Sequence, residues 1–353
     1  MKIQVRTPAT SANLGPGFDA LGMAHGLYDD LVVEFSTVAP GGEPLTEVAV
    51  SGQGAGQVPL DDTHLVVQAI RTTIARAGGE QPNLALTCNN NIPHGRGLGS
   101  SAAAVVSGIT AALAYLDGPE RYSRQAALEL STEFEGHPDN AAPAIFGGAT
   151  VAWLDDACEP GGEVGAAVGS PDGIGVSQIP TNSPKPQAAK IPVHDQIAAT
   201  LLIPEVTLST KTARAALPAE VPHRDAAFNA ARAALNVVAL SAQPQLLFAA
   251  TEDRLHQPYR AAQMPESTRV LRALRQRGFA ATISGAGPTV LVLCERHQLP
   301  QLDEALLEVI GVSGDISGSD DGGMSGLSGP KSAPWQVIRP ELDEKGAQAR
   351  RII

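Results

Sequence analysis

The stretch that decides the fold is Pro93-His94-Gly95-Arg96-Gly97-Leu98-Gly99-Ser100-Ser101, which continues into the mostly apolar residues 102–116. Glycines at alternate positions remove side chains from a short loop, so its backbone N–H groups can approach a ligand closely. Two serines follow where a helix is expected to begin, and a helix N-terminus favours an anion. The spacing matches neither the Gly-Lys-Ser/Thr phosphate loop nor the Gly-x-Gly-x-x-Gly of dinucleotide-binding folds. A flexible turn before a core helix is the alternative, but the serine pair and the long helix favour a phosphate-binding loop.

This stretch and two others resemble motifs of a known superfamily. Residues 93–103, Pro-x-x-x-Gly-Leu-Gly-Ser-Ser-Ala-Ala, are similar to the phosphate-binding loop of the GHMP kinases, named for galactokinase, homoserine kinase, mevalonate kinase and phosphomevalonate kinase. The other two motifs are residues 8–19, Pro-Ala-Thr-Ser-Ala-Asn-Leu-Gly-Pro-Gly-Phe-Asp, and residues 284–289, Ser-Gly-Ala-Gly-Pro-Thr. The form of the first of these, together with Glu-Gly-His-Pro-Asp-Asn at 135–140, most resembles the homoserine kinase members. The motifs occur in order over nearly the whole chain.

Composition limits the class of protein. A chain of 353 residues with 43% apolar and 18% charged residues should form about two globular domains. The net charge of −12 argues against nucleic acid or an anionic membrane as a partner. Cys88, Cys158 and Cys294 are widely separated, which predicts a reducing, cytoplasmic location and no cysteine metal cage. No apolar run reaches the roughly 18 residues of a membrane span, so none is expected.

The resemblance implies an α+β architecture in two parts. Residues 1–154 would form the N-terminal, ATP-binding domain and residues 155–353 a ferredoxin-like C-terminal domain, with ATP and substrate in the cleft between them. Residues 144–154 are interpreted as a buried strand, and residues 180–192, with four prolines, as an extended surface loop. Residues 312–334 are rich in Gly, Ser and Asp without periodicity, which predicts a disordered insertion.

Glu135 has a position that suggests a metal ion. It lies in the last turn of a predicted helix, residues 123–135, where the helix dipole disfavours a negative charge. An exposed Glu in a fraying turn is the alternative, but the Gly-His-Pro-Asp-Asn continuation favours a carboxylate that binds Mg²⁺. The resemblance implies that Ser101, with Ser100 as the second choice, shares Mg²⁺ with Glu135. It also implies that the phosphates of ATP contact Pro93, His94, Gly95, Arg96, Gly97, Leu98, Gly99, Ser100, Ser101, Ala102 and Ala103.

The resemblance further implies a small-alcohol site for L-homoserine. Its residues would be Asn13, Asp19, His137, Asn140, Thr210, Arg214, Arg260 and Gly285. Homoserine carries an ammonium and a carboxylate, so Asp19 can bind the ammonium while Arg214 and Arg260 clamp the carboxylate. Turn capping by Asn13 and Asp19, and surface ion pairs for the two arginines, are the plainer alternatives.

The proton acceptor is not obvious from the sequence. Mevalonate-kinase-like members place an Asp where Asn140 stands, and Asn cannot act as a base. His137 is the alternative base, although a lone His more often forms a hydrogen bond or packs. We therefore expect Glu135, Ser101 and Asn140 to carry catalysis, with the phosphate itself or solvent receiving the proton. Asp139 is expected to point elsewhere.

The functional hypothesis is ATP-dependent phosphorylation of the L-homoserine hydroxyl in threonine biosynthesis. Another small-alcohol GHMP kinase and a catalytically silent ligand-binding homologue are the alternatives. Homoserine kinases usually carry Asn near the adenine where this chain has His64, so the adenine contacts stay open. The oligomeric state is also open, with a homodimer as one option.

Overall fold

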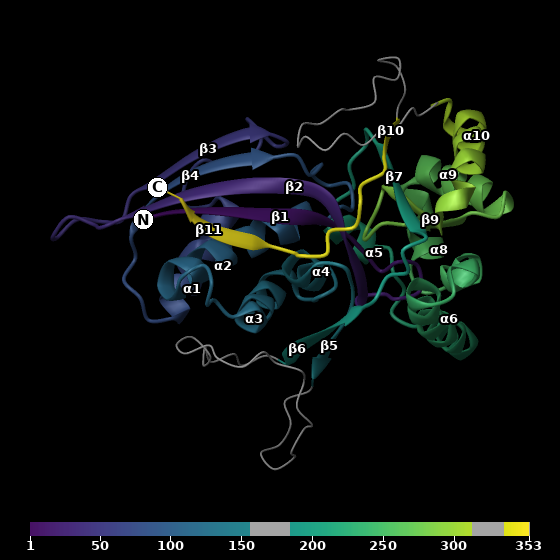
Figure 1. Cartoon of the computed structure of the whole chain (residues 1–353), viewed down its shortest axis with the longest axis horizontal. Helices are drawn as coiled ribbons and strands as arrows, with labels where there is room; N and C mark the ends of the chain where they lie inside the picture. Colours follow the sequence, from purple (N-terminus) through teal and green to yellow (C-terminus); the bar gives the residue numbers. More distant parts are fainter. Residues whose placement is uncertain (156–183, 313–334, 353) are drawn as a thin grey trace, which may run out of the picture.

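The computed structural model describes residues 1–155, 184–312 and 335–352, which form two sheets covered by helices (Figure 1). The expected α+β architecture is confirmed. The insertion expected at 312–334 lies outside the described residues except for Val312.

The larger sheet has seven strands in the order β11-β1-β2-β4-β3, with β5 pairing with β2 and β6 with β5. Its pairs are antiparallel except for the parallel β3–β4 pair. The strands are β1 (Lys2–Ala12), β2 (Leu21–Ser36), β3 (Thr46–Gly52), β4 (Asn83–Asn90), β5 (Ala149–Asp155), β6 (Lys185–Ile191) and β11 (Gln348–Ile352).

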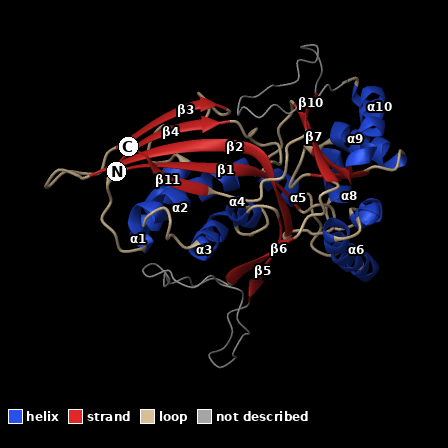
Figure 2. Cartoon of the chain, viewed as in Figure 1, coloured by secondary structure: helices blue, strands red, loops and turns tan. Residues whose placement is uncertain are grey.

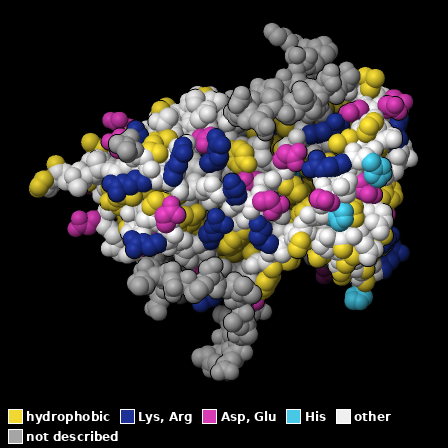
Figure 3. All heavy atoms as spheres, in the orientation of Figure 1, with side chains coloured by type: hydrophobic (Ala, Val, Ile, Leu, Met, Phe, Trp, Pro, Cys, Tyr) yellow, Lys and Arg dark blue, Asp and Glu magenta, His cyan; other side chains and the backbone are white. Residues whose placement is uncertain are grey.

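Helices cover one face of this sheet (Figure 2). They are α1 (Leu65–Arg76), α2 (Ser100–Asp117), α3 (Arg124–Glu135) and α4 (Ala141–Phe146). Ile3 and Val5 alternate with polar neighbours along β1 and are fully buried against the helices. On the opposite face, Lys and Arg side chains lie with Asp and Glu among them (Figure 3); Arg6 and Asp30 form one such pair.

Helix α2 is buried on nearly every side. It is the one helix in the described part of the chain that is long and apolar enough to cross a membrane, and 67% of it is buried inside the structure. That burial is expected of a helix at the centre of a protein core, where apolar residues face neighbours all round.

The smaller sheet has the strand order β10-β7-β9-β8, and all its pairs are antiparallel. Its strands are β7 (Ile197–Pro204), β8 (Ala280–Ile283), β9 (Val290–Glu295) and β10 (Trp335–Ile338). Helices connect β7 to β8 and β9 to β10, so chain order and strand order together give the βαββαβ arrangement of a ferredoxin-like fold.

Helices surround this second sheet. They are α5 (Thr210–Ala215), α6 (His223–Ser241), α7 (Leu247–Ala250), α8 (Gln257–Arg260), α9 (Pro265–Gln276) and α10 (Leu299–Ile310), with the 3₁₀ turns η1 (Pro244–Leu246), η2 (Ala261–Gln263) and η3 (Arg296–Gln298).

Two local predictions differ from the structure. Residues 144–154 do not form one strand, because Gly147 and Gly148, both with positive φ, end α4 and redirect the chain into β5. Within the proline-rich segment 180–192, residues 185–191 form strand β6 and pair with β5. Pro186 is tolerated there because β6 is an edge strand, which needs donors on only one side.

The proposed division after residue 154 stays a prediction. Strands β6 and β11 both lie beyond it in the sequence but pair in the larger sheet. A division by sheet would therefore assign both strands to the N-terminal part.

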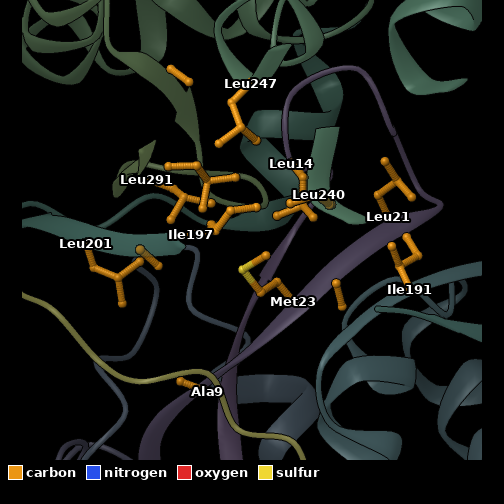
Figure 4. Close-up of a cluster of buried hydrophobic side chains, with 14 of the residues drawn as sticks. Ala9, Leu14, Leu21, Met23, Ile191, Ile197, Leu201, Leu240, Leu247 and Leu291 are labelled. Atoms are coloured by element: carbon orange, nitrogen blue, oxygen red, sulfur yellow. The ribbon is translucent and has the colours of Figure 1, made fainter. Parts of the chain in front are cut away.

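One hydrophobic cluster joins the two parts (Figure 4). Leu14 comes from the loop between β1 and β2, and Leu21 and Met23 come from β2, whereas Leu201 and Leu291 come from the smaller sheet. The loop 13–20 carries most of the motif at residues 8–19. It is therefore part of the contact between the two parts.

Candidate active site

The predicted phosphate loop connects β4 to α2 and needs its glycines. Gly95, Gly97 and Gly99 have φ values of 64°, 74° and 69°, which side chains rarely adopt. A Cβ on Gly97 would lie 2.3 Å from the Ser284 carbonyl oxygen, and one on Gly99 would lie 2.0 Å from Thr10 Oγ1. The loop therefore packs its backbone directly against both other motifs.

The two serines that follow lie in the first turn of α2 and do not cap it. Gly99 is the N-cap residue, and because glycine has no side chain the helix has no side-chain cap. Ser101 Oγ donates instead to Glu135 Oε1 at 2.7 Å. The Ser101–Glu135 pair predicted to bind Mg²⁺ is thus in direct contact at the ends of two helices, α2 and α3.

Burial acts on the Glu135 carboxylate. It raises the pKa of Glu135, and the hydrogen bond from Ser101 offsets this only in part. A carboxylate held in surroundings that disfavour its charge gains from a cation nearby. This observation matches the donor set expected for a hard divalent ion.

Residues from all the predicted motifs line one cavity, which we call the cleft pocket. Its lining consists of Asn13, Asp19, Gly95, Gly97, Gly99, Ser100, Ser101, Ala102, Glu135, His137, Asp139, Asn140, Leu208, Ser209, Thr210, Arg214, Arg260, Gly285 and Ala286. All eight residues predicted to bind substrate are among them. The structure therefore brings together groups up to about 270 residues apart, such as Asn13 and Gly285.

Some of the predicted phosphate-loop residues do not line the cleft pocket. Pro93, Leu98 and Ala103 are buried in the core. The Arg96 guanidinium donates to the Pro204 carbonyl at 2.8 Å and the Glu205 carbonyl at 2.7 Å. Arg96 therefore ties the loop to the end of β7 in the second part.

Asp139 lies in the cleft pocket, contrary to the expectation that it points elsewhere. Its Oδ1 lies 2.5 Å from His137 Nδ1, in the short segment between α3 and α4. Burial alone would lower the pKa of His137, but the hydrogen bond and charge of Asp139 outweigh burial and raise it. Next to this pair, Asn140 Oδ1 accepts a hydrogen bond from Thr10 Oγ1 at 2.8 Å.

The His137–Asp139 pair predicts a pH dependence. Because the folded-state pKa of His137 is raised above its usual 6.5, the pair stabilises the fold fully below about pH 6.5. That stabilisation is lost as the pH rises through the folded-state pKa. We expect Asp139→Asn to lower the pKa of His137. The measurement is an NMR titration of the imidazole Cε1 proton. An unchanged titration midpoint would show that Asp139 does not set the charge of His137.

Asp19 and Arg214 face each other across the cleft. Arg214 Nη2 lies 2.8 Å from Asp19 Oδ1 and Nη1 lies 3.0 Å from Oδ2, so the pair is bidentate. Both side chains are partly exposed, at 32% and 42%. Asp19 raises the pKa of Arg214 through this hydrogen bond. The two groups predicted to bind opposite ends of a zwitterion therefore neutralise each other in this structure.

Arg260 differs from Arg214 because it is only 2% exposed. Nε donates to the Ala213 carbonyl at 3.2 Å, and Nη1 lies 3.3 Å from both the Gly285 carbonyl and His256 Nδ1. Among the described residues, none of its hydrogen bonds goes to a carboxylate. Burial accordingly lowers the pKa of Arg260. Asp19, Asp253 and Asp139 act on Arg260 only through space, and a buried guanidinium that forms no ion pair among the described residues favours an anionic ligand at the wall of a pocket.

The loop 13–20 is held in an unusual backbone conformation. Asn13, Leu14 and Asp19 have φ values of 69°, 44° and 56°, although none is glycine. Such residues cost on the order of 1–3 kcal/mol each and persist only where their surroundings hold them. The Asn13 amide contributes, since its Nδ2 donates to the Gly285 carbonyl at 2.8 Å and its Oδ1 accepts from the Asp19 N–H at 3.0 Å.

A second cavity of about 300 Å³ lies beside the cleft pocket and shares Ser100 and Ser101 with it. We call it the side pocket, and its volume is at the lower end of small-molecule sites. Its walls are mostly apolar, with Val58, Pro59 and Leu65 among them. The buried Nδ1 of His64, another lining residue, has no hydrogen-bond partner among the described residues. A polar atom without a hydrogen-bond partner in a mostly apolar pocket is suited to bind a flat, polar ring.

Comparison with known proteins places this geometry in a family. Residues 64–148 match the family model described as "GHMP kinases N terminal domain", and residues 230–309 match "GHMP kinases C terminal". The homoserine kinase of Clavibacter michiganensis is 51% identical over 292 residues, covering 83% of this chain and 82% of the relative. The chain belongs to the homoserine kinase family of the GHMP kinases. The homoserine kinase of Leifsonia xyli is 45% identical over 350 residues, covering 99% of this chain and 92% of the relative.

Solved structures support the fold of this family. A homoserine kinase from Cytophaga hutchinsonii superposes with a TM-score of 0.74 at 22% identity, covering 99% of this chain and 97% of that one. A mevalonate diphosphate decarboxylase from Staphylococcus aureus superposes with a TM-score of 0.59 at 14% identity. The two-part architecture is thus shared by proteins whose names state different chemistry.

Proposed function

We propose that this chain transfers the γ-phosphoryl group of ATP to the hydroxyl of L-homoserine, giving O-phospho-L-homoserine and ADP in threonine biosynthesis. Relatives 44–51% identical over 83–99% of the chain are named homoserine kinase. The observation that carries the proposal is the cleft pocket, where a buried, unpaired Arg260 and the Asp19 carboxylate lie close to the Ser101–Glu135 pair.

The two cavities suggest how the substrates divide between them. The side pocket would hold the adenine, with the unpartnered His64 Nδ1 available as a hydrogen-bond acceptor or donor. The shared Ser100 and Ser101 at the start of α2 would lie beside the phosphates, where backbone N–H groups and the helix dipole attract negative charge. The cleft pocket is left for the amino acid.

The residues present fit a magnesium ion. Ser101 and Glu135 supply one hydroxyl and one carboxylate oxygen, the hard donors that Mg²⁺ combines with phosphate oxygens and water. When bound, the ion would neutralise charge on the phosphates. Glu135 is partly buried, and its charged form is disfavoured without such a partner.

The chain's own residues would act mainly by alignment. Arg260 would take the homoserine carboxylate and Asp19 its ammonium, with Arg214 released from Asp19 to complete the carboxylate clamp. The hydroxyl oxygen then forms a bond to the γ-phosphorus as the bond from that phosphorus to the bridging oxygen of ADP breaks. Asn140, oriented by Thr10, would hold the hydroxyl without accepting its proton, which would pass to the transferred phosphate or to solvent.

Two alternative functions are less well supported. A silent ligand-binding homologue is disfavoured by the intact Ser101–Glu135 contact, and a mevalonate-type kinase by Asn140 in place of an acidic residue. The cytoplasmic location stays a prediction, and the oligomeric state stays open, with a homodimer as one option.

The test of the proposal is ADP release by the wild-type protein with ATP, Mg²⁺ and L-homoserine, with the product identified by ³¹P NMR. We expect one O-phospho-L-homoserine for each ADP. ATP binding without homoserine-dependent ADP release would instead support a silent homologue.

A further inference from the structure

Three consecutive carbonyl oxygens in the loop 13–20 each accept a hydrogen bond from a buried side chain of the second part. The Leu14 carbonyl accepts from Asn236 Nδ2 at 2.7 Å, and the Pro16 carbonyl accepts from Asn229 Nδ2 at 3.2 Å. The Gly15 carbonyl lies 2.7 Å from His256 Nε2. We call Asn229, Asn236 and His256 the loop clamp. None of the three was predicted as a functional residue from the sequence, and the two asparagines lie inside helix α6 without a motif around them.

The loop clamp is itself rigid. Asn236 and His256 are fully buried, and Asn229 is 2% exposed. Asn229 also donates to the buried Asp253 at 2.9 Å and accepts from the Arg254 N–H at 2.8 Å, so its amide orientation is fixed. These hydrogen bonds hold the Asn229 amide in one arrangement, whereas the buried Asn236 Oδ1 has no hydrogen-bond partner among the described residues.

His256 also contacts Arg260, another residue that lines the cleft pocket. With Nε2 donating to the Gly15 carbonyl, Nδ1 is left as the acceptor for Arg260 Nη1 at 3.3 Å. One imidazole therefore touches both the loop that carries Asp19 and the guanidinium of Arg260. Burial lowers the pKa of His256, which keeps this neutral form present at neutral pH.

The position of these contacts suggests more than core packing. They fall between Asn13 and Asp19, the two loop residues that line the cleft pocket, and beside the left-handed residue Leu14. Gly15 packs closely against the second part, since a Cβ there would lie 2.6 Å from the Thr251 carbonyl oxygen. The hydrogen bond from the Asp19 N–H to Asn13 Oδ1 links the start of this loop to Asp19.

We infer that Asn229, Asn236 and His256 are positioning residues that fix Asp19 and Arg260 at the spacing an amino-acid substrate requires. The inference rests on the proposed function, because it names what sets the selectivity of the same site. It predicts that damage to the loop clamp impairs homoserine binding specifically and leaves the phosphate loop, which these side chains do not contact, unaffected.

Asn236→Leu, His256→Leu and His256→Gln test this directly. The leucine variants keep bulk and remove the donor, whereas Gln retains a donor and an acceptor. Thr73→Val is the control, because Thr73 is equally buried but donates to the Ala69 carbonyl within α1, away from the cleft pocket. The measurements are Tm, the KM for homoserine, the KM for ATP, and the Kd for ADP by calorimetry.

We expect the leucine variants to raise the homoserine KM at least about tenfold, since a buried acceptor is left unpaired. The ATP KM and the ADP Kd should stay near wild-type values, His256→Gln should recover most of the loss, and Thr73→Val should lower only Tm. Unchanged homoserine KM in folded variants, or equal rises for homoserine and ATP, would overturn the inference.

The two levels of the proposal can be told apart. If the wild type shows no homoserine-dependent ADP release while binding ADP, the proposed function fails and the inference fails with it. If the wild type turns over homoserine and the variants do so with the same KM, only the inference fails. Should Asn236→Leu not fold, the His256 pair decides, and equal behaviour of Gln and Leu there would contradict the inference.

Discussion

Glu135→Gln should lower kcat by about 10³-fold or more while the protein stays folded, because metal neutralisation of phosphate charge is worth several kcal/mol in phosphoryl transfer. The basis is the carboxylate at the end of α3, in contact with Ser101 beside the phosphate loop. Steady-state kinetics with saturating ATP, Mg²⁺ and homoserine would measure the change.

Glu133→Gln is the matched control on the same helix. Glu133 lies two residues before Glu135 in α3 and does not line the cleft pocket. Its carboxylate pairs with Arg76 at the end of α1. Its replacement should leave kcat near the wild-type value. Near-normal turnover of Glu135→Gln in Mg²⁺ would remove Glu135 from the site.

The Glu135→Gln substitution should lower activity without lowering the stability of the fold. A carboxyl group whose folded-state pKa is raised binds more protons when folded, so stability falls as the pH rises from the usual 4.5 through the raised value. Gln does not titrate and avoids that loss. Glu135→Gln should therefore have a Tm at neutral pH, without Mg²⁺, equal to or above that of the wild type.

Arg260→Lys should raise the homoserine KM by about 10- to 100-fold, since charge-assisted hydrogen bonds are worth about 1.5–3 kcal/mol and Lys cannot reproduce a planar fork. The ATP KM should change little, because Arg260 lines the cleft pocket and not the side pocket. Homoserine methyl ester lacks the carboxylate charge, so its KM should differ little between the wild type and the variant.

Arg269→Lys provides the comparison for that experiment. Arg269 pairs with Glu266 on the exposed side of α9, so a conservative change there should leave both KM values unaltered. If Arg260→Lys raised the KM of the methyl ester as much as that of homoserine, Arg260 would act on the fold of the pocket and not on the carboxylate.

The sequence predicted the groups of the site better than their contacts. The glycine loop and Glu135 could be recognised because glycine spacing and helix-end charge are local features, whereas Arg214 and Arg260 followed only from the family resemblance. The Asp19–Arg214 ion pair could not be recognised, since it joins a loop and a helix almost 200 residues apart in the chain. The role of Arg96 was equally hidden, because a basic residue in a phosphate loop suggests an anion and not the two carbonyls it contacts.

The fold shows the same division between local and long-range features. The alternation along β1 and the apolar length of α2 indicated a strand and a core helix correctly. Strand β6 was missed because prolines mark loops in isolation, and only its pairing with β5 at the sheet edge makes a strand there. The return of β11 to pair with β1 likewise depends on contacts between the two ends of the chain.

The most direct test of the central claim is the relative turnover of L-homoserine and mevalonate by the wild-type protein, with ATP and Mg²⁺ saturating. Mevalonate offers a carboxylate and a hydroxyl but no ammonium for Asp19. We expect kcat/KM for homoserine to exceed that for mevalonate by at least about tenfold, the value of one charge-assisted hydrogen bond. Equal turnover of the two alcohols would contradict an amino-acid site built from Asp19 and Arg260.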